Sequence, residues 1–298
     1  MNKQQVVVSL PNDNAYQHEQ AQVAHAAGKL LGLDLQVIHA NDDAITQSQQ
    51  LLQIIQSKTA RPNALLVEPV TATGLRRVAE AAVAEGIAWV VSNSNVDYVK
   101  DLRKNPKIPV FTVTQGQTEI GRLQGKQLAA LLPNGGSALY IQGPSTSSVA
   151  AQRNEGVESA RARNVQFTSI RSKWSEASAY QSVTAWLRLA TSRAEKFAAV
   201  VGHTHELALG ARKAFEEIEN PDQRKKWLEL PFIGIGIASQ VKPLVDARSL
   251  AAAVVTSVTV DLALKLLVRS LDSQVQPPEC TFVEAWSYPD LQKLAARR

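Results

Sequence analysis

Residues 64–91 read ALLVEPVTATGLRRVAEAAVAEGIAWVV, and this stretch decides the fold class. A short apolar run at 64–67 is followed by a segment, 74–85, in which apolar residues recur at helical spacing. Gly86 is placed to end that helix, and a second apolar run follows at 87–91. Short continuous runs are typical of buried parallel strands, so the stretch predicts a strand–helix–strand unit.

The same alternation extends outward over the whole chain. Helical patterns separate the apolar runs, and polar residues collect between each run and the next helix. The runs that we interpret as strands form a first set at 6–10, 35–39, 64–67, 87–91 and 110–113, a second set at 138–142, 165–170, 198–202, 232–236 and 251–255, and a final strand at 281–284. We therefore expect an α/β protein with two doubly wound parallel-sheet lobes.

The composition excludes several classes of protein. The net charge of +5 is spread along the chain, whereas a nucleic-acid surface needs a concentrated basic patch. The single cysteine, Cys280, cannot form an intrachain disulfide. No run approaches the roughly 18 consecutive apolar residues of a membrane helix. The first strand begins almost at the terminus, so we expect either a cytosolic protein or one whose signal peptide has been removed.

No enzyme motif is present. The chain lacks a phosphate-binding loop and a nucleophile elbow, and Gly234-Ile235-Gly236-Ile237 lacks the third glycine of a dinucleotide fingerprint. His203, His205 and Glu206 could begin a metal site, but no further ligand is signalled. We interpret the histidines as loop residues, still able to hydrogen-bond a ligand. We expect no catalytic residue, no metal and no cofactor.

Polar residues after the predicted strands are candidates for ligand binding. In open α/β sheets, these loops line the crevice at the carboxyl ends of the strands. They include Asn12, Asp13, Asn93 and Ser94, although helix capping alone also explains such residues.

Sugar binding needs an aromatic stacking surface as well as polar partners. Aromatics make up only 5% of the chain, so a tryptophan beside the expected crevice is informative. Trp174 stands between a strand and a helix, where its ring could stack on the C–H face of a sugar. Together with Tyr16 and Arg153, the polar loop residues would supply a concave site with few placed polar groups.

The chain resembles the type I periplasmic sugar-binding proteins, which share a fold with the effector domain of lac-repressor-like regulators. The resemblance covers essentially the whole chain. It is carried by Ile141-Gln142-Gly143-Pro144, Ala150-Ala151-Gln152-Arg153-Asn154-Glu155-Gly156, Glu206-Leu207-Ala208-Leu209-Gly210-Ala211, Phe232-Ile233-Gly234-Ile235-Gly236 and Leu65-Leu66-Val67-Glu68-Pro69. It implies lobes of 1–113 with 257–283 and 114–256 with 284–298, joined by a three-crossing hinge.

The resemblance also implies the ligand-binding residues. Arg153 matches the family's ligand arginine, and Asn12, Tyr16 and Trp174 match its polar and aromatic positions. Three carboxylates of the usual pattern are replaced, at Asn93-Ser94, Thr204-His205 and Gly236. The expected ligand-binding set is Asn12, Asp13, Tyr16, Asn93, Ser94, Arg153, Trp174, Thr204, His205, Gly236 and Thr256. Because Arg153 is kept while carboxylates are lost, an anionic or modified sugar, or a different small polar ligand, competes with a simple pentose or hexose.

From these features we expect a non-enzymatic, periplasmic solute-binding protein that closes on a sugar, polyol or sugar derivative. Its partner would be the permease of an ABC-type transporter. We expect the binding protein itself to be monomeric. The alternative is the ligand-sensing core of a lac-repressor-like regulator or signalling system that lacks its output domain. No helix-turn-helix precedes the first strand, so this chain alone is not expected to bind nucleic acid. An enzyme on the same fold is the third and least favoured class.

Overall fold

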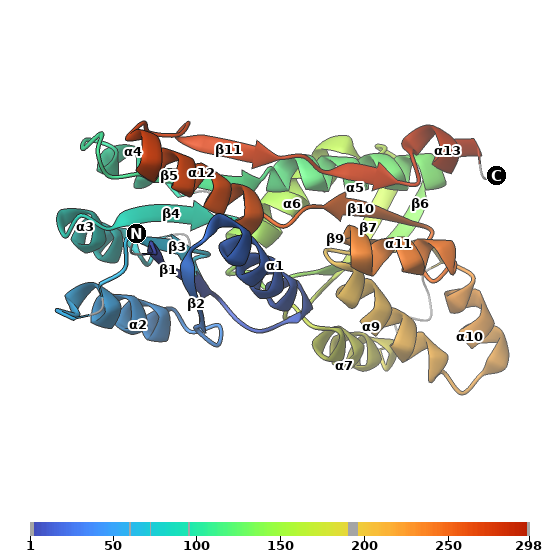
Figure 1. Ribbon diagram of the computed structural model, residues 1–298. Helices are drawn as coiled ribbons and strands as arrows, with labels where there is room; N and C mark the ends of the chain where they lie inside the picture. Colours follow the sequence, from blue (N-terminus) through green and yellow to red (C-terminus); the bar gives the residue numbers. More distant parts are fainter. Residues whose placement is uncertain (1–2, 60, 72, 95, 190–195, 297–298) are drawn as a thin grey trace. The chain divides into compact units, whose positions relative to one another are not determined.

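The computed structural model describes residues 3–59, 61–71, 73–94, 96–189 and 196–296. The chain divides into two compact units (Figure 1). Unit 1 comprises Met1–Gln115 and Val258–Val283, and unit 2 comprises Gly116–Ser257 and Glu284–Arg298. Each unit is built around one six-stranded sheet. No helix in the described part of the chain is long and apolar enough to span a membrane.

The sheet of unit 1 is parallel throughout, in the order β11-β5-β4-β3-β1-β2. Its strands are β1 (Gln5–Leu10), β2 (Asp34–His39), β3 (Ala64–Val67), β4 (Ala88–Ser92), β5 (Val110–Gln115) and β11 (Cys280–Val283). The helices are α1 (Ala15–Leu31), α2 (Ala44–Gln56), α3 (Arg76–Ala84), α4 (Val99–Leu102) and α12 (Val260–Ser273). The chain passes from β1 to β2 on one side and returns to β3 on the other, so the strand order reverses between β1 and β3.

Burial on both faces explains why the strands of unit 1 are apolar at consecutive positions. Side chains alternate across a strand, so Val6 and Val8 join the core cluster that contains α1 and α12 residues. Val7 joins the opposite cluster, with residues of α2 and α3. The run Ala64–Val67 divides in the same way, which confirms the strand predicted there.

Unit 2 repeats the plan, in the order β12-β10-β9-β8-β6-β7. The strands are β6 (Gly136–Gln142), β7 (Val165–Arg171), β8 (Phe197–Gly202), β9 (Phe232–Ile237), β10 (Ala252–Thr256) and β12 (Trp286–Tyr288). The helices are α5 (Gln117–Leu131), α6 (Ser148–Ala160), α7 (Glu176–Leu187), α9 (His205–Glu216), α10 (Pro221–Leu228), α11 (Ala238–Asp246) and α13 (Leu291–Ala296). Here the order reverses between β6 and β8.

The predicted α/β class and the paired sheets are confirmed, whereas several short elements were not predicted. These are α4, α10, α13 and β12, of which β12 pairs antiparallel with β10. Two or three residues give no readable period, so a strand as short as β12 depends on its neighbour. Helix α10 has no buried residue, which removes the apolar stripe that would have revealed it.

Close packing of α5 against α6 places the residues at the start of both helices. A Cβ atom added at Gly156 would lie 2.0 Å from the carbonyl oxygen of Thr118, and one at Gly121 would lie 2.0 Å from that of Arg153. Only glycine allows these two backbones to approach so closely. The contact holds α6, which carries Arg153, directly on α5.

We expect Gly156→Ala to destabilise the protein by about 2–3 kcal/mol, because the added methyl group overlaps the backbone of α5 and the helices must separate. Urea unfolding followed by circular dichroism measures the change. Glu155→Ala, at the exposed neighbouring position of the same helix, is the control and should change stability by only about 0.5 kcal/mol. Equal stability of Gly156→Ala and the control would contradict the close contact.

Candidate functional site

In each unit one residue lies at the equivalent position, directly after the strand beside which the strand order reverses. Glu68 is the first residue after β3, and its N–H donates to the carbonyl oxygen of Ser9 in β1 (2.9 Å). His203 is the first residue after β8, and its N–H donates to the carbonyl oxygen of Ile141 in β6 (2.9 Å). In doubly wound sheets, ligands bind beside such a reversal, at the carboxyl ends of the strands. Both side chains are buried, and burial shifts the pKa of each.

In unit 1, amide groups surround the carboxylate of Glu68. Gln17 Nε2 and Asn93 Nδ2 donate to Oε1 at 2.8 and 3.0 Å, and Gln20 Nε2 lies 3.5 Å from Oε2. The Gln20 amide also joins α12, because its Nε2 donates to Thr259 Oγ1 (3.1 Å) and its Oε1 accepts from the N–H of Val260 (3.2 Å). Burial raises the pKa of Glu68 to about 7, and the three amides oppose that rise without cancelling it.

Two predicted residues, Tyr16 and Asn93, lie in this cluster. Asn93 is buried and has a left-handed backbone, with a φ angle of 52°. The hydroxyl of Tyr16 accepts from Gln115 Nε2 (3.2 Å) and lies 3.4 Å from Gln20 Nε2. We call the set Tyr16, Gln17, Gln20, Glu68, Asn93 and Gln115 the unit 1 face.

The other predicted residues of unit 1 lie outside this cluster of hydrogen bonds. Asn12 Oδ1 accepts from the N–H of Asn14 (3.1 Å), and Asn12 Nδ2 donates to Asp42 (2.7 Å). The Asn12 amide therefore shapes the loop that leads into α1. Asp13 is exposed in that loop, and Ser94 is buried beside Asn93.

In unit 2, the equivalent residue, His203, is locked in one neutral form. The N–H of Gly143 donates to Nδ1 (3.1 Å), which places the ring proton on Nε2. Nε2–H then donates to the hydroxyl of Tyr140 (2.5 Å). Burial lowers the pKa of His203 to about 3, helped by the positive charges of Arg153 and Arg171. The imidazole is therefore neutral at physiological pH.

Arg153 of α6 is buried against this histidine. Its Nη1 donates to the carbonyl oxygen of His203 (2.6 Å), and its Nε donates to Oε1 of Gln117 (2.9 Å). The guanidinium carbon lies 5.8 Å from the ring centroid of Trp174, a distance typical of a cation–π contact. The structure thus brings together Arg153 and Trp174, two of the predicted residues.

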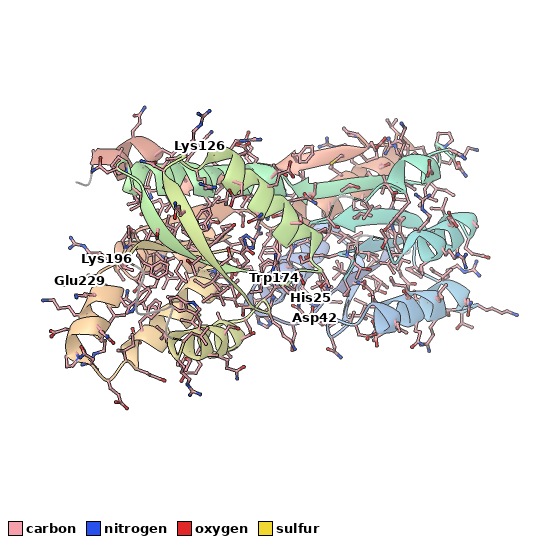
Figure 2. The ribbon with its side chains drawn as sticks, turned by 180° about the vertical axis from the view of Figure 1, so that it is seen from behind. His25, Asp42, Lys126, Trp174, Lys196 and Glu229 are labelled. Carbon is pink, nitrogen blue, oxygen red and sulfur yellow. The ribbon has the colours of Figure 1, made fainter. Side chains whose placement is uncertain are left out.

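Trp174 occupies the loop after β7, where Figure 2 labels it, and is half-buried. Its ring lies over Gly143, where an added Cβ would meet the indole at 2.2 Å. It also stacks near-parallel to His203, with ring centroids 6.1 Å apart. The ring orientation is therefore set by backbone and by a locked imidazole, a preorganised surface for an apolar ligand face.

Two of the replaced carboxylate positions, His205 and Gly236, are structurally coupled. A Cβ added at Gly236 would lie 2.6 Å from His205 Nδ1, so the imidazole fills the space that a larger residue 236 would need. Nδ1 lies 3.3 Å from the carbonyl oxygen of Ile235, and burial lowers the pKa of His205. A neutral imidazole thus covers the carboxyl end of β9. We call Gln117, Arg153, Trp174, His203 and His205 the unit 2 face.

The last two predicted residues have local structural roles. Thr204 is the N-cap of α9, where its Oγ1 accepts from the N–H of Leu207 (3.2 Å). Thr256 is buried as the last residue of β10 and pairs with Ile237. The hydroxyl of Thr204 thus serves the N-terminus of its own helix.

The ligand-binding set expected from the sequence left out Glu68, His203 and the glutamines around them. Gln17 and Gln20 lie three residues apart on the buried side of α1, a polar pair inside an apolar stripe. Glu68 follows a fully buried strand without a break. Polar residues at such core-facing positions were the available signal, because a buried polar group needs a partner.

The model of the periplasmic binding protein domain matches residues 6–273. This chain belongs to the periplasmic binding protein family. Among curated proteins, a putative rhizopine-binding protein of Rhizobium meliloti is 26% identical over 195 residues. That match covers 64% of this chain and 60% of the relative's own length.

Solved structures of other binding proteins share the fold. An ABC transporter solute-binding protein from Actinobacillus succinogenes 130z, with bound D-allose, has a TM-score of 0.82 at 17% identity and covers 99% of this chain and 100% of its own. A Bacillus halodurans C-125 solute-binding protein with bound myo-inositol has a TM-score of 0.76 at 18% identity, covering 100% and 99%. A Mycobacterium smegmatis protein in complex with β-D-fucofuranose has a TM-score of 0.82 at 15% identity, covering 98% and 93%.

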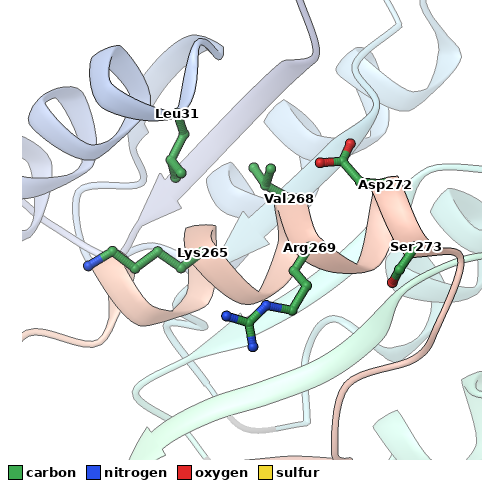
Figure 3. A pocket seen from close by; sticks show the side chains of 6 residues that line it. All are labelled: Leu31, Lys265, Val268, Arg269, Asp272 and Ser273. Carbon is green, nitrogen blue, oxygen red and sulfur yellow. The ribbon is translucent and has the colours of Figure 1, made fainter.

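A surface pocket in unit 1 lies away from the unit 1 face (Figure 3). It is lined by Leu31 at the end of α1 and by residues of α12 from Lys265 to Ser273. Gln20 and Thr259, by contrast, meet near the beginnings of these two helices. Long charged side chains line much of the pocket, in contrast to the amide cluster around Glu68.

The raised pKa of Glu68 predicts a specific pH dependence of stability. The folded state keeps the proton up to about pH 7, while the unfolded state releases it near 4.5, so the wild type loses stability as pH rises through this window. Glu68→Gln lacks this loss. Its free energy of unfolding relative to wild type should rise by roughly 3 kcal/mol between pH 4.5 and 7 and then stay level.

Urea unfolding at a series of pH values measures this difference. Glu80→Gln, at an exposed position of α3, serves as the control and should change stability little at any pH. A constant difference between Glu68→Gln and wild type over the whole range would show that Glu68 does not titrate abnormally.

Proposed function

We propose that the chain is a periplasmic solute-binding protein that takes up a small polar molecule, a sugar, polyol or sugar derivative, and delivers it to the permease of an ABC-type transporter. The family supports the binding role. The related structures described above contain D-allose, myo-inositol and β-D-fucofuranose, which are compact and rich in hydroxyl groups. Such ligands need placed polar partners together with a flat apolar surface.

One observation carries this proposal: the buried guanidinium of Arg153 is set beside the oriented ring of Trp174. The two bonds from Arg153 to His203 and Gln117 fix the guanidinium plane before any solute arrives. Preorganised polar groups reduce the entropy lost on binding. The unit 2 face thus supplies a directional donor and a stacking surface to one small molecule.

The unit 1 face supplies complementary chemistry. It offers amide and phenol groups, from Gln17, Asn93 and Tyr16, that match hydroxyl groups in donor and acceptor character. The chain crosses between units near residues 115, 257 and 283. We infer a hinge at these crossings, whose equilibrium the bound solute biases.

A thermal-shift screen of the purified protein against neutral sugars, polyols, sugar acids and sugar phosphates tests this function. A compound at about 100 times its dissociation constant adds roughly 2.7 kcal/mol to the free energy of unfolding and raises the melting temperature. Anionic hits would assign the charged ligand class, and neutral hits the simple sugars. No shift with any class, and no small molecule released from denatured protein, would contradict the proposal.

Variants of the unit 2 face test where the solute binds. Trp174→Ala should weaken binding of the best compound about three- to tenfold, because a stacking surface is lost. Arg153→Ala should weaken it about tenfold or more, since a charged hydrogen bond contributes more. Arg153→Lys keeps the positive charge but lacks the planar guanidinium. It tests the same role if Arg153→Ala does not fold.

Calorimetry measures the affinities, with a melting curve for each variant. Arg122→Ala on α5 and Trp286→Ala on β12 are the controls, because both side chains lie on exposed surfaces of unit 2. Unchanged affinity in both Trp174→Ala and Arg153→Lys would remove the unit 2 face from the binding site.

A further inference from the structure

Glu68 is an unusual residue to find between a core strand and a binding face. Its side chain is buried, and its hydrogen bonds come from neutral amides. Ion pairs typically compensate buried carboxylates, and an uncharged residue of the same size would avoid the desolvation cost. A residue that costs stability in this way is typical of a functional site.

The surroundings of Glu68 contain polar groups from five elements. Gln17, Gln20 and Tyr16 come from α1, and Gln47 of α2 donates to the carbonyl oxygen of Glu68 (2.9 Å) and to Ser9 of β1 (3.1 Å). Ser92 and Asn93 follow from β4, and Thr259 precedes α12. Among these described groups, Tyr16 is the titratable one, and no neighbouring charge contributes to the pKa shift of Glu68.

Asn93 depends on this carboxylate. A non-glycine residue in the left-handed region costs roughly 1 kcal/mol, and it persists where its surroundings hold it. Asn93 Nδ2 donates to Glu68 Oε1 (3.0 Å), while its backbone N–H donates to the carbonyl oxygen of Val113 (2.9 Å). A hydrogen bond to an ionised acceptor is roughly twice as strong as one to a neutral acceptor.

A hydrogen-bond acceptor is also available to a protonated Glu68. Gln17 Oε1 is buried and accepts no hydrogen bond in the described structure. Rotation of the Gln17 amide would bring that oxygen to the carboxyl group, where it could accept a bond from the protonated Glu68. Gln17 Nε2 would then no longer donate to Glu68 Oε1, and the hydrogen bond from Asn93 would lose its charged acceptor.

We propose that Glu68 is a positioning residue of the unit 1 face: its ionised carboxylate holds Asn93 and Gln17 in place, and uptake of one proton reorients Gln17, weakens the hold on Asn93 and lowers solute affinity. The proposal rests on the proposed function for its effect on affinity. Its structural part, the hold on Asn93, stands without any solute. Neutral pH is the range in which this change takes place, because burial raises the pKa of Glu68 to about 7.

A second carboxyl group whose pKa is raised into the same range provides a matched control. Burial and the charge of Glu176 raise the pKa of Glu206, on α9 in unit 2, to about 7. Burial lowers the pKa values of His203 and His205, away from this range. Glu206→Gln removes this half-buried acid, which has no part in the unit 1 face, so it separates the effect of Glu68 from that of pH alone.

The first experiment needs no solute. Asparagine side-chain amides of the full chain are labelled with ¹⁵N, and the Asn93 signal, assigned by its loss in Asn93→Ala, is followed from pH 5.5 to 8.5. In wild type and in Glu206→Gln, the signal should shift with a midpoint near 7. In Glu68→Gln it should not respond to pH. A signal that is constant in wild type, or that shifts equally in Glu68→Gln, overturns the proposal.

The second experiment measures affinity by calorimetry at pH 6 and pH 8, with D-allose and myo-inositol as probes. Wild type and Glu206→Gln should bind about fivefold more weakly at pH 6, as expected when charged hydrogen bonds become neutral. Glu68→Gln should bind weakly at both pH values while melting no lower than wild type at pH 8. Equal affinity of all three proteins at both pH values overturns the link to binding.

The two experiments separate the two claims. If neither probe binds at either pH while the Asn93 signal still titrates through Glu68, the positioning role holds and the proposed function is contradicted for these solutes. If a probe binds and the Asn93 signal does not titrate, the proposed function holds and the role of Glu68 is wrong.

Discussion

A charged side chain buried at the carboxyl edge of a parallel sheet must find polar partners, and the rest of each binding face depends on this requirement. In unit 1 the charge is that of Glu68, and the amides of α1 and the loop after β4 gather around it. In unit 2 the charge is that of Arg153, held by Gln117 and the carbonyl oxygen of His203. Each set ties helices to the strand ends and so defines a face, because the bonds join elements far apart in the chain.

The two units meet the same topological constraint with opposite chemistry. The residue after the third strand of each unit bonds back to the first strand of that unit, yet one is an acid and the other a histidine. Burial acts on them in opposite directions, because it disfavours whichever form is charged. It raises the pKa of Glu68 and lowers that of His203. Near neutral pH, the histidine is a fixed neutral hydrogen-bonding group, while the acid is close to its titration midpoint.

A solute-binding function would explain why the chain keeps arrangements that cost stability. A left-handed Asn93, a partly compensated carboxylate and glycine contacts that hold α6 on α5 all restrict the chain without adding apolar burial. Each places a polar or aromatic group in one orientation at a strand end. Preorganisation of this kind favours a small polar solute, which offers little apolar area with which to offset the ordering of flexible side chains.

The sequence by itself determined the order of strands and helices, because strands buried on both faces require apolar runs and helices require a recurring stripe. It also indicated Tyr16, Asn93 and Trp174, since polar and aromatic residues after such runs lie at the carboxyl edge of a sheet, and the family resemblance indicated Arg153. Only the tertiary structure decided which polar residues are buried and what they bond. Gln20 and Thr259 are 239 residues apart, yet their bond helps to build the cluster around Glu68. Asn12 and Thr204 have the same polar character as the face residues, but Asn12 bonds to Asn14 and Asp42 in the loops before α1 and α2, and Thr204 caps α9. Desolvation and pairing depend on the atoms around a group in space, so neither the protonation of Glu68 and His203 nor the fit of His205 over Gly236 follows from residue type and spacing.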